Sequence, residues 1–149
     1  MVEALIYVLA AIVFAYISIE DARTLHIPVV PLWVMTAVVF IIHCLSGAVW
    51  FAATGYVAGA ALTLLVRTIG SWAAGEEAMG MGDVHLLAAV GCCFGAKIAV
   101  FSFFFGNILG LVYWVFYRKR RVPMIPAFSV AALLSVFICE PVLKVLMQR

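Results

Sequence analysis

Long apolar segments separated by short polar turns run along the whole chain. A helix needs about 20 mostly apolar residues to span a bilayer, with a range of about 17–25. The pattern predicts six helices, over residues 3–20, 29–46, 48–69, 83–95, 97–117 and 124–146. The fourth segment is short for a full span, so five helices with one broken or merged segment are an alternative. We therefore expect an all-α membrane protein, a polytopic bundle of about six transmembrane helices.

Composition supports lipid as the solvent for most of the chain. Of the 149 residues, 68% are hydrophobic and 11% are charged, whereas soluble domains have about 45–50% apolar and about 25% charged residues. A formal net charge of +2 is too small to indicate a nucleic-acid partner. We expect membrane lipids as partners and a single integral-membrane domain over residues 1–149, with the N-terminal segment kept as a helix.

Two aspartates stand at the ends of apolar segments, where charge is costly. Asp21 closes the first segment, and Asp83 opens the fourth. A carboxylate at membrane depth costs roughly 2.5–3.5 kcal/mol on insertion scales. Two carboxylates that approach closely cannot both stay ionised, so such a pair shares a proton. One can then activate water while the other hydrogen-bonds to a carbonyl, which is general acid–base hydrolysis of a peptide.

Each aspartate also has a simpler interpretation. Asp21 could be an interfacial residue that ends a helix, and Asp83 could be a helix N-cap. Gly80 and Gly82 both lie just before Asp83. We expect them to permit backbone conformations that a side chain would forbid and to leave room for an extended substrate strand.

The distribution of basic residues predicts the orientation in the membrane. Three loops share one side of a six-helix bundle and carry six of the nine basic residues: Arg23, Arg67, Arg118, Lys119, Arg120 and Arg121. The other side carries Lys97, Lys144 and Arg149. The richer side should be cytoplasmic. Both termini then lie outside the cytoplasmic membrane, and both aspartates face the cytoplasm.

Glycines and cysteines fit packing roles. Small residues at four-residue spacing predict close helix contacts, at Gly55 and Gly59, Gly91 and Gly95, and Gly106 and Gly110. The cysteines, at positions 44, 92, 93 and 139, form no CxxC motif. We expect no metal site and no cofactor.

Three segments resemble a known family. The segment from Gly75 to Gly91, GEEAMGMGDVHLLAAVG, resembles the signature of type IV prepilin peptidases, which belong to the GxGD class of intramembrane aspartyl proteases. The segment DARTLHIP, from Asp21 to Pro28, is similar to the family's first aspartate motif. The segment VPMIPAF, over residues 122–128, resembles the proline-containing start of its last helix.

The resemblance implies that Asp21 and Asp83 are the catalytic pair. Members of the family cleave the short basic leader from prepilin-like precursors (type IV pilins, pseudopilins or archaellin-type proteins) just before a hydrophobic stem, at the cytoplasmic face. Four polar residues near the pair are candidates for supporting or substrate-contact roles: Glu20, Glu76, Glu77 and His85. The glutamates either face water or contact the basic leader, and a further alternative for Glu77 is that it positions its loop or tunes Asp83. His85 projects from a different helix face than Asp83.

The chain departs from the family pattern in three places. Val29 follows Pro28 where the family often has asparagine, and His85 stands where it often has lysine. The insert with paired CxxC motifs, associated with N-methylation of the product, is absent. We therefore expect the short, peptidase-only form, without methyltransferase activity.

Two other functions stay open as alternatives. A small proton-coupled transporter could use the acids as a relay, although they stand at segment ends and no inverted repeat is visible. A non-catalytic subunit of a secretion or pilus-assembly machine would not need both aspartates. The sequence does not predict the oligomeric state.

Overall fold

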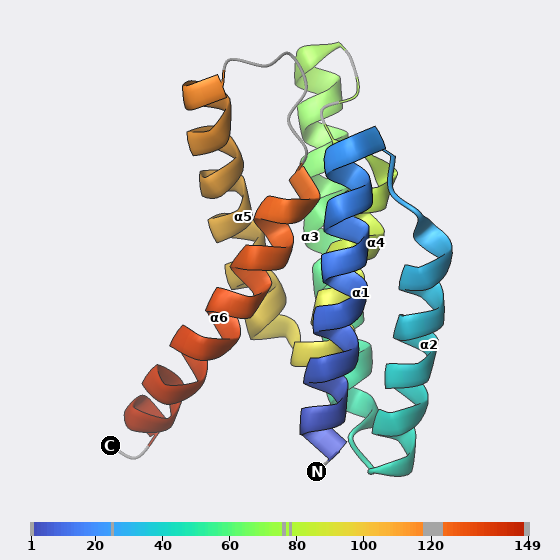
Figure 1. Cartoon of the computed structure of the whole chain (residues 1–149). Helices are drawn as coiled ribbons and strands as arrows, with labels where there is room; N and C mark the ends of the chain where they lie inside the picture. Colours follow the sequence, from blue (N-terminus) through green and yellow to red (C-terminus); the bar gives the residue numbers. More distant parts are fainter. Residues whose placement is uncertain (1, 25, 76, 78, 118–123, 148–149) are drawn as a thin grey trace.

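The computed structural model describes residues 2–24, 26–75, 77, 79–117 and 124–147. Six helices make up this part of the chain: α1 (Val2–Thr24), α2 (Val29–Leu45), α3 (Val49–Ala74), α4 (Met81–Phe94), α5 (Ala96–Tyr117) and α6 (Met124–Met147). They run alternately up and down, so both ends of the chain lie at the same end of the bundle (Figure 1). The all-α fold with six helices is confirmed.

Three helices extend further than the hydrophobic pattern predicts. α1 continues to Thr24, so Asp21 lies inside this helix and does not end it. Polar residues alone do not stop a helix, and the first strong breaker is Pro28. α3 continues to Ala74, where Gly75 adopts the left-handed conformation (φ 71°) that ends helices. α4 begins at Met81, which makes Asp83 its third residue.

Three helices contain segments long and apolar enough to cross a membrane. These segments are Ala4–Thr24 in α1, Val49–Ala73 in α3 and Ala96–Tyr113 in α5. The other apolar segments within the described residues are shorter: Val29–Leu45, Met81–Phe94 and Ile125–Val136. The chain is therefore a multi-pass membrane protein. α4, about 21 Å long at 1.5 Å per residue, is short for a span, as the sequence predicts.

α4 lies at the centre of the bundle and contacts each of the other five helices. All of its residues from Leu86 to Phe94 are buried. α3 packs most closely against it, since a Cβ on Gly55 would collide with the carbonyl of Gly91 and one on Gly59 with the carbonyl of Leu87. The close helix contact predicted for these glycines is therefore present, and it brings two backbones together.

The same contacts fix the height of Asp83 along α3. The two helices are antiparallel, and Gly59 faces Leu87. Asp83, one turn earlier in α4, is therefore level with Thr63, one turn later in α3. α3 continues for about 16 Å beyond this level, at 1.5 Å per residue. Figure 1 shows α3 and α5 rising past the end of α1.

Replacing Gly59 by valine should destabilise the bundle by about 3 kcal/mol, the upper end of the usual cost of overpacking. The added carbons meet the Leu87 carbonyl, which is part of a helix backbone and cannot turn away. Thermal unfolding in detergent measures the effect. Ala61→Val, at an exposed position of the same helix, is the matched control. Equal stability of the two variants would contradict the backbone contact.

Candidate active site

Asp21 and Asp83 come together at one end of the bundle. Asp21 is 5% exposed and Asp83 is 6% exposed. Their helices, α1 and α4, are in contact, and the two carboxylates lie close enough for their negative charges to repel one another. Two buried acids within electrostatic reach form the arrangement in which one proton is shared.

Asp21 caps the start of α6. Its Oδ2 accepts a hydrogen bond from the backbone N–H of Ile125, with an N–O distance of 3.2 Å. Ile125 is the second residue of α6, and the first four N–H groups of a helix have no acceptor within that helix. One turn before Asp21 in α1 and one turn after Ile125 in α6, the Ser18 hydroxyl donates to the Ser129 hydroxyl at 2.9 Å. Two polar contacts therefore join α1 to α6.

Asp83 caps the start of its own helix. It is the third residue of α4, and its carboxylate accepts a hydrogen bond from the backbone of Gly80, the N-cap residue. This is the return half of a capping box, in which the third helical side chain satisfies the N-cap N–H. Each aspartate thus lies at a helix N-terminus, where the partial positive charge favours an ionised carboxylate.

The conformational role expected for Gly80 and Gly82 is wrong. Gly80 has an ordinary φ of −69°, and Gly82 lies inside helix α4. Gly82 matters instead for space, because a Cβ there would collide with the side chain of Ile27. The Ile-Pro turn after α1 therefore packs directly against the glycine that precedes Asp83. The two sequence motifs are in contact, which sets the distance between their aspartates.

The supporting candidates do not all gather at the pair. Glu20 is half-buried beside Asp21 on α1. Glu77 is exposed and pairs with Arg67 of α3, with an Oε1–Nη2 distance of 2.6 Å. His85 is half-buried on another face of α4, where its ring meets the ring of Trp33 edge-on at 5.6 Å between centroids. Glu76 lies outside the described residues, as does the basic segment 118–121.

Sequence reasoning missed Ile125, Ser18 and Ser129. The partner of Asp21 is 104 positions away, and nothing local in either segment indicates the contact. The available signal was the resemblance of residues 122–128 to a family motif, which marks the segment without saying what it binds. Among the described residues, no group of three or more His, Cys, Asp or Glu side chains is placed to hold a metal ion.

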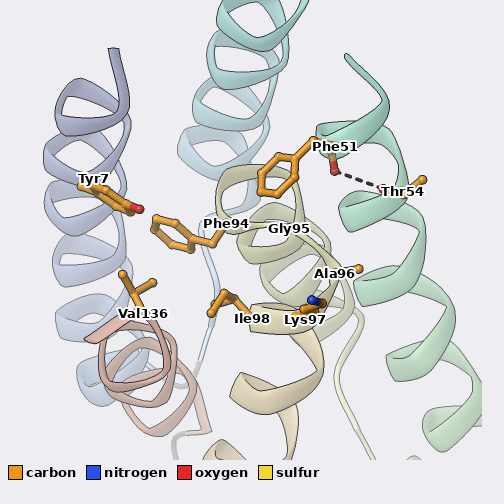
Figure 2. A pocket seen from close by; sticks show the side chains of 9 residues that line it. All are labelled: Tyr7, Phe51, Thr54, Phe94, Gly95, Ala96, Lys97, Ile98 and Val136. Carbon is orange, nitrogen blue, oxygen red and sulfur yellow. Dashed lines mark hydrogen bonds between the residues drawn. The ribbon is translucent and has the colours of Figure 1, made fainter. Parts of the chain in front are cut away.

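A separate cavity of about 450 Å³ lies at the far end of the bundle. It surrounds the α4–α5 junction, with Gly95 and Lys97 on one side and the stacked rings of Tyr7 and Phe94 on the other (Figure 2). Tyr7 is about 21 Å from Asp21 along the axis of α1, at 1.5 Å per residue. This cavity is therefore not part of the aspartate site.

Asp21→Leu should be less stable than Asp21→Asn by about 1–3 kcal/mol, the cost of an unsatisfied buried N–H. Both variants remove the charge, but only the asparagine side chain keeps an oxygen that can accept from Ile125. Chemical unfolding of the two variants in detergent provides the comparison. Indistinguishable stabilities would show that the hydrogen bond to α6 contributes nothing.

Comparison with known proteins gives one assignment. A family model described as Type IV leader peptidase family matches residues 8–115, well over half of the chain and including both aspartates. Searches of curated proteins and of solved structures found no match. The family consists of aspartic prepilin peptidases, which agrees with the paired acids at the end of α1 and the start of α4. The chain belongs to the type IV leader peptidase family.

Proposed function

We propose that this protein is an intramembrane aspartyl endopeptidase that removes the short basic leader from prepilin-like precursors, with Asp21 and Asp83 as the catalytic residues. The observation that carries the proposal is the burial of these two acids within reach of each other's charge, at one end of a membrane bundle. The family match supports the substrate class, which includes type IV pilins, pseudopilins and archaellin-type proteins.

The proposed reaction uses one proton shared by the pair. The ionised carboxylate takes a proton from a water molecule. The oxygen of that water molecule attacks the carbonyl carbon of the scissile peptide bond. The protonated carboxyl hydrogen-bonds to the carbonyl oxygen and supports the charge that develops on it. A proton then passes to the peptide nitrogen, and the C–N bond breaks. The chemistry needs only these groups and water.

The N-termini of two helices favour the state in which Asp21 and Asp83 share one proton inside a membrane. Burial disfavours any carboxylate charge, and two acids side by side disfavour it further. The N-termini of α4 and α6 supply backbone donors to Asp83 and Asp21 respectively. These donors favour a single negative charge on the pair, which is the charge that the proposed reaction requires.

The proposed site faces the cytoplasm. Arg23 follows Asp21 by two residues in α1, Arg67 lies in the part of α3 beyond the level of Asp83, and Lys97 is the second residue of α5, at the opposite end of α4 from Asp83. By the positive-inside rule this distribution supports the proposed orientation, in which both termini are outside. Because α3 continues well past the level of Asp83, cleavage would take place below the membrane surface. Glu20, beside Asp21, is suited to contact a basic leader there.

Asp21→Asn and Asp83→Asn should each lower the rate of leader cleavage by about 10²–10⁴-fold, the usual contribution of a general acid or base. Asparagine has nearly the same shape but neither takes nor gives the proton. Cleavage of a purified precursor in detergent micelles is followed by the size of the product. Cys44→Ser, at the opposite end of the bundle, serves as the control. Full activity in either asparagine variant would sink the two-aspartate mechanism.

Cysteine labelling in intact cells should reveal the predicted orientation. Ser46→Cys lies in the exposed α2–α3 turn, and Thr24→Cys lies at the exposed end of α1 near the aspartates. In a Cys44→Ser, Cys139→Ser background, a membrane-impermeant maleimide should label position 46 directly. Position 24 should be labelled only after the cells are permeabilised. The reverse pattern would place the aspartates outside.

A further inference from the structure

The central helix ends before its neighbours do. α4 has 14 residues, whereas α1 has 23. From the level of the paired aspartates, α1 extends back for about 28 Å and α4 for only about 17 Å, at 1.5 Å per residue. The chain then turns at Gly95 (φ 86°) into α5. The cavity of about 450 Å³ around this turn is the space that α4 does not fill, and its volume is typical of a ligand site, about 300–1,000 Å³.

One side of this cavity is cationic. Lys97 is the only charged side chain among the described residues that line it, and no described acid forms an ion pair with it. Lys97 is also the second residue of α5, and the first four N–H groups of a helix have no acceptor within that helix. Gly95, which precedes α5, has no side chain to cap them. The lysine and the start of α5 therefore both favour an anion on this side.

The opposite side of the cavity is apolar. The rings of Tyr7 and Phe94 stack there at 5.4 Å between centroids, and Val136 of α6 lies on the same side (Figure 2). Phe94 is buried, whereas Lys97 and Phe51 are exposed. The cavity thus has an apolar interior and a cationic opening. A small anion would leave the apolar side uncovered, so the matching ligand carries both a negative group and a hydrocarbon chain.

The cavity lies at the depth where lipid headgroups meet acyl chains. Tyr7 is the sixth residue of α1 and Phe51 is the third residue of α3, so both are within two turns of a helix end. Trp50 is 79% exposed next to Phe51, and tryptophan is enriched at membrane–water interfaces. A lysine at this depth lays its stem along apolar surface and keeps its ammonium group at the interface. Lys97 is therefore level with lipid phosphates.

We propose that this cavity binds one anionic phospholipid, with its phosphate at Lys97 and one acyl chain against Tyr7 and Val136. The lipid comes from the leaflet at this end of the bundle. A net negative headgroup is favoured because a zwitterionic lipid brings its own cation close to Lys97. The bound chain completes the packing beyond the end of α4. This site is remote from the aspartates, and the inference does not depend on the proposed peptidase activity.

Native mass spectrometry tests the headgroup. The protein is purified in detergent with equal amounts of phosphatidylglycerol and phosphatidylcholine of the same chain length. Wild type should retain one phosphatidylglycerol, about fivefold more often than phosphatidylcholine. Lys97→Gln should lower phosphatidylglycerol retention by about fivefold, equivalent to about 1 kcal/mol for one basic residue. Lys144→Gln removes the same charge about 12 Å from Val136 along α6 and should leave retention unchanged.

A second pair of variants tests the acyl chain. Val136→Trp fills part of the apolar side and should lower retention of both lipids by at least about fivefold. Val130→Trp adds the same side chain at an exposed position of α6 and should retain phosphatidylglycerol as wild type does. Thermal unfolding in lipid-free detergent identifies a misfolded variant. If Val136→Trp is misfolded, the exposed Lys97→Gln variant decides the result.

Thermal stability separates a lipid from a free anion. Phosphatidylglycerol at about ten times its Kd should raise the Tm of wild type by about 3–5 °C, because a ligand that binds only the folded state stabilises it. The increase should be smaller in Lys97→Gln, and inorganic phosphate should give none. Equal shifts with inorganic phosphate, equal retention of the two lipids by wild type, or unchanged retention in Lys97→Gln would each overturn the anionic-lipid site.

Discussion

The backbone contact between α3 and α4 is the constraint on which the rest of the structure depends. α4 is short and buried along nearly its whole length, so it must be surrounded by other helices. Glycines at positions 55, 59 and 91 allow α3 to come close enough to cover one side of it. With α4 held at the centre, its first turn is brought against α1, and Asp83 meets Asp21. The acids are thus placed by backbone packing that begins one turn of α4 away from Asp83.

The two carboxylates combine structural and chemical roles. Each accepts a backbone hydrogen bond at a helix N-terminus, which offsets part of the cost of burying it. The contact between Ile27 and Gly82 fixes the approach of the two motifs. The site is therefore built from short-range contacts among three helix ends. Gly82, whose expected role was to allow an unusual backbone conformation, instead leaves space for the side chain of Ile27.

The helices and the aspartates could be predicted from the sequence, because apolar length and costly charge are local properties. The extension of α1 past Asp21 does not follow from the hydrophobic pattern, because a change in polarity does not by itself end a helix. The bond to Ile125 could not be found, since it joins segments that only the folded bundle brings together. The same holds for His85: helical geometry separates it from Asp83, but only the packing of α2 shows that it faces Trp33.

The hydrogen bond between Asp21 and the first turn of α6 couples the protonation state of Asp21 to the contact between α1 and α6. A hydrogen bond to an ionised carboxylate is roughly twice as strong as one to a neutral acceptor. In the proposed reaction the shared proton moves during each turnover. The hydrogen bond that joins α1 to α6 is therefore stronger when Asp21 is ionised and weaker when Asp21 is protonated. Movement of α6 relative to α1 would then follow the catalytic cycle, driven by a single proton.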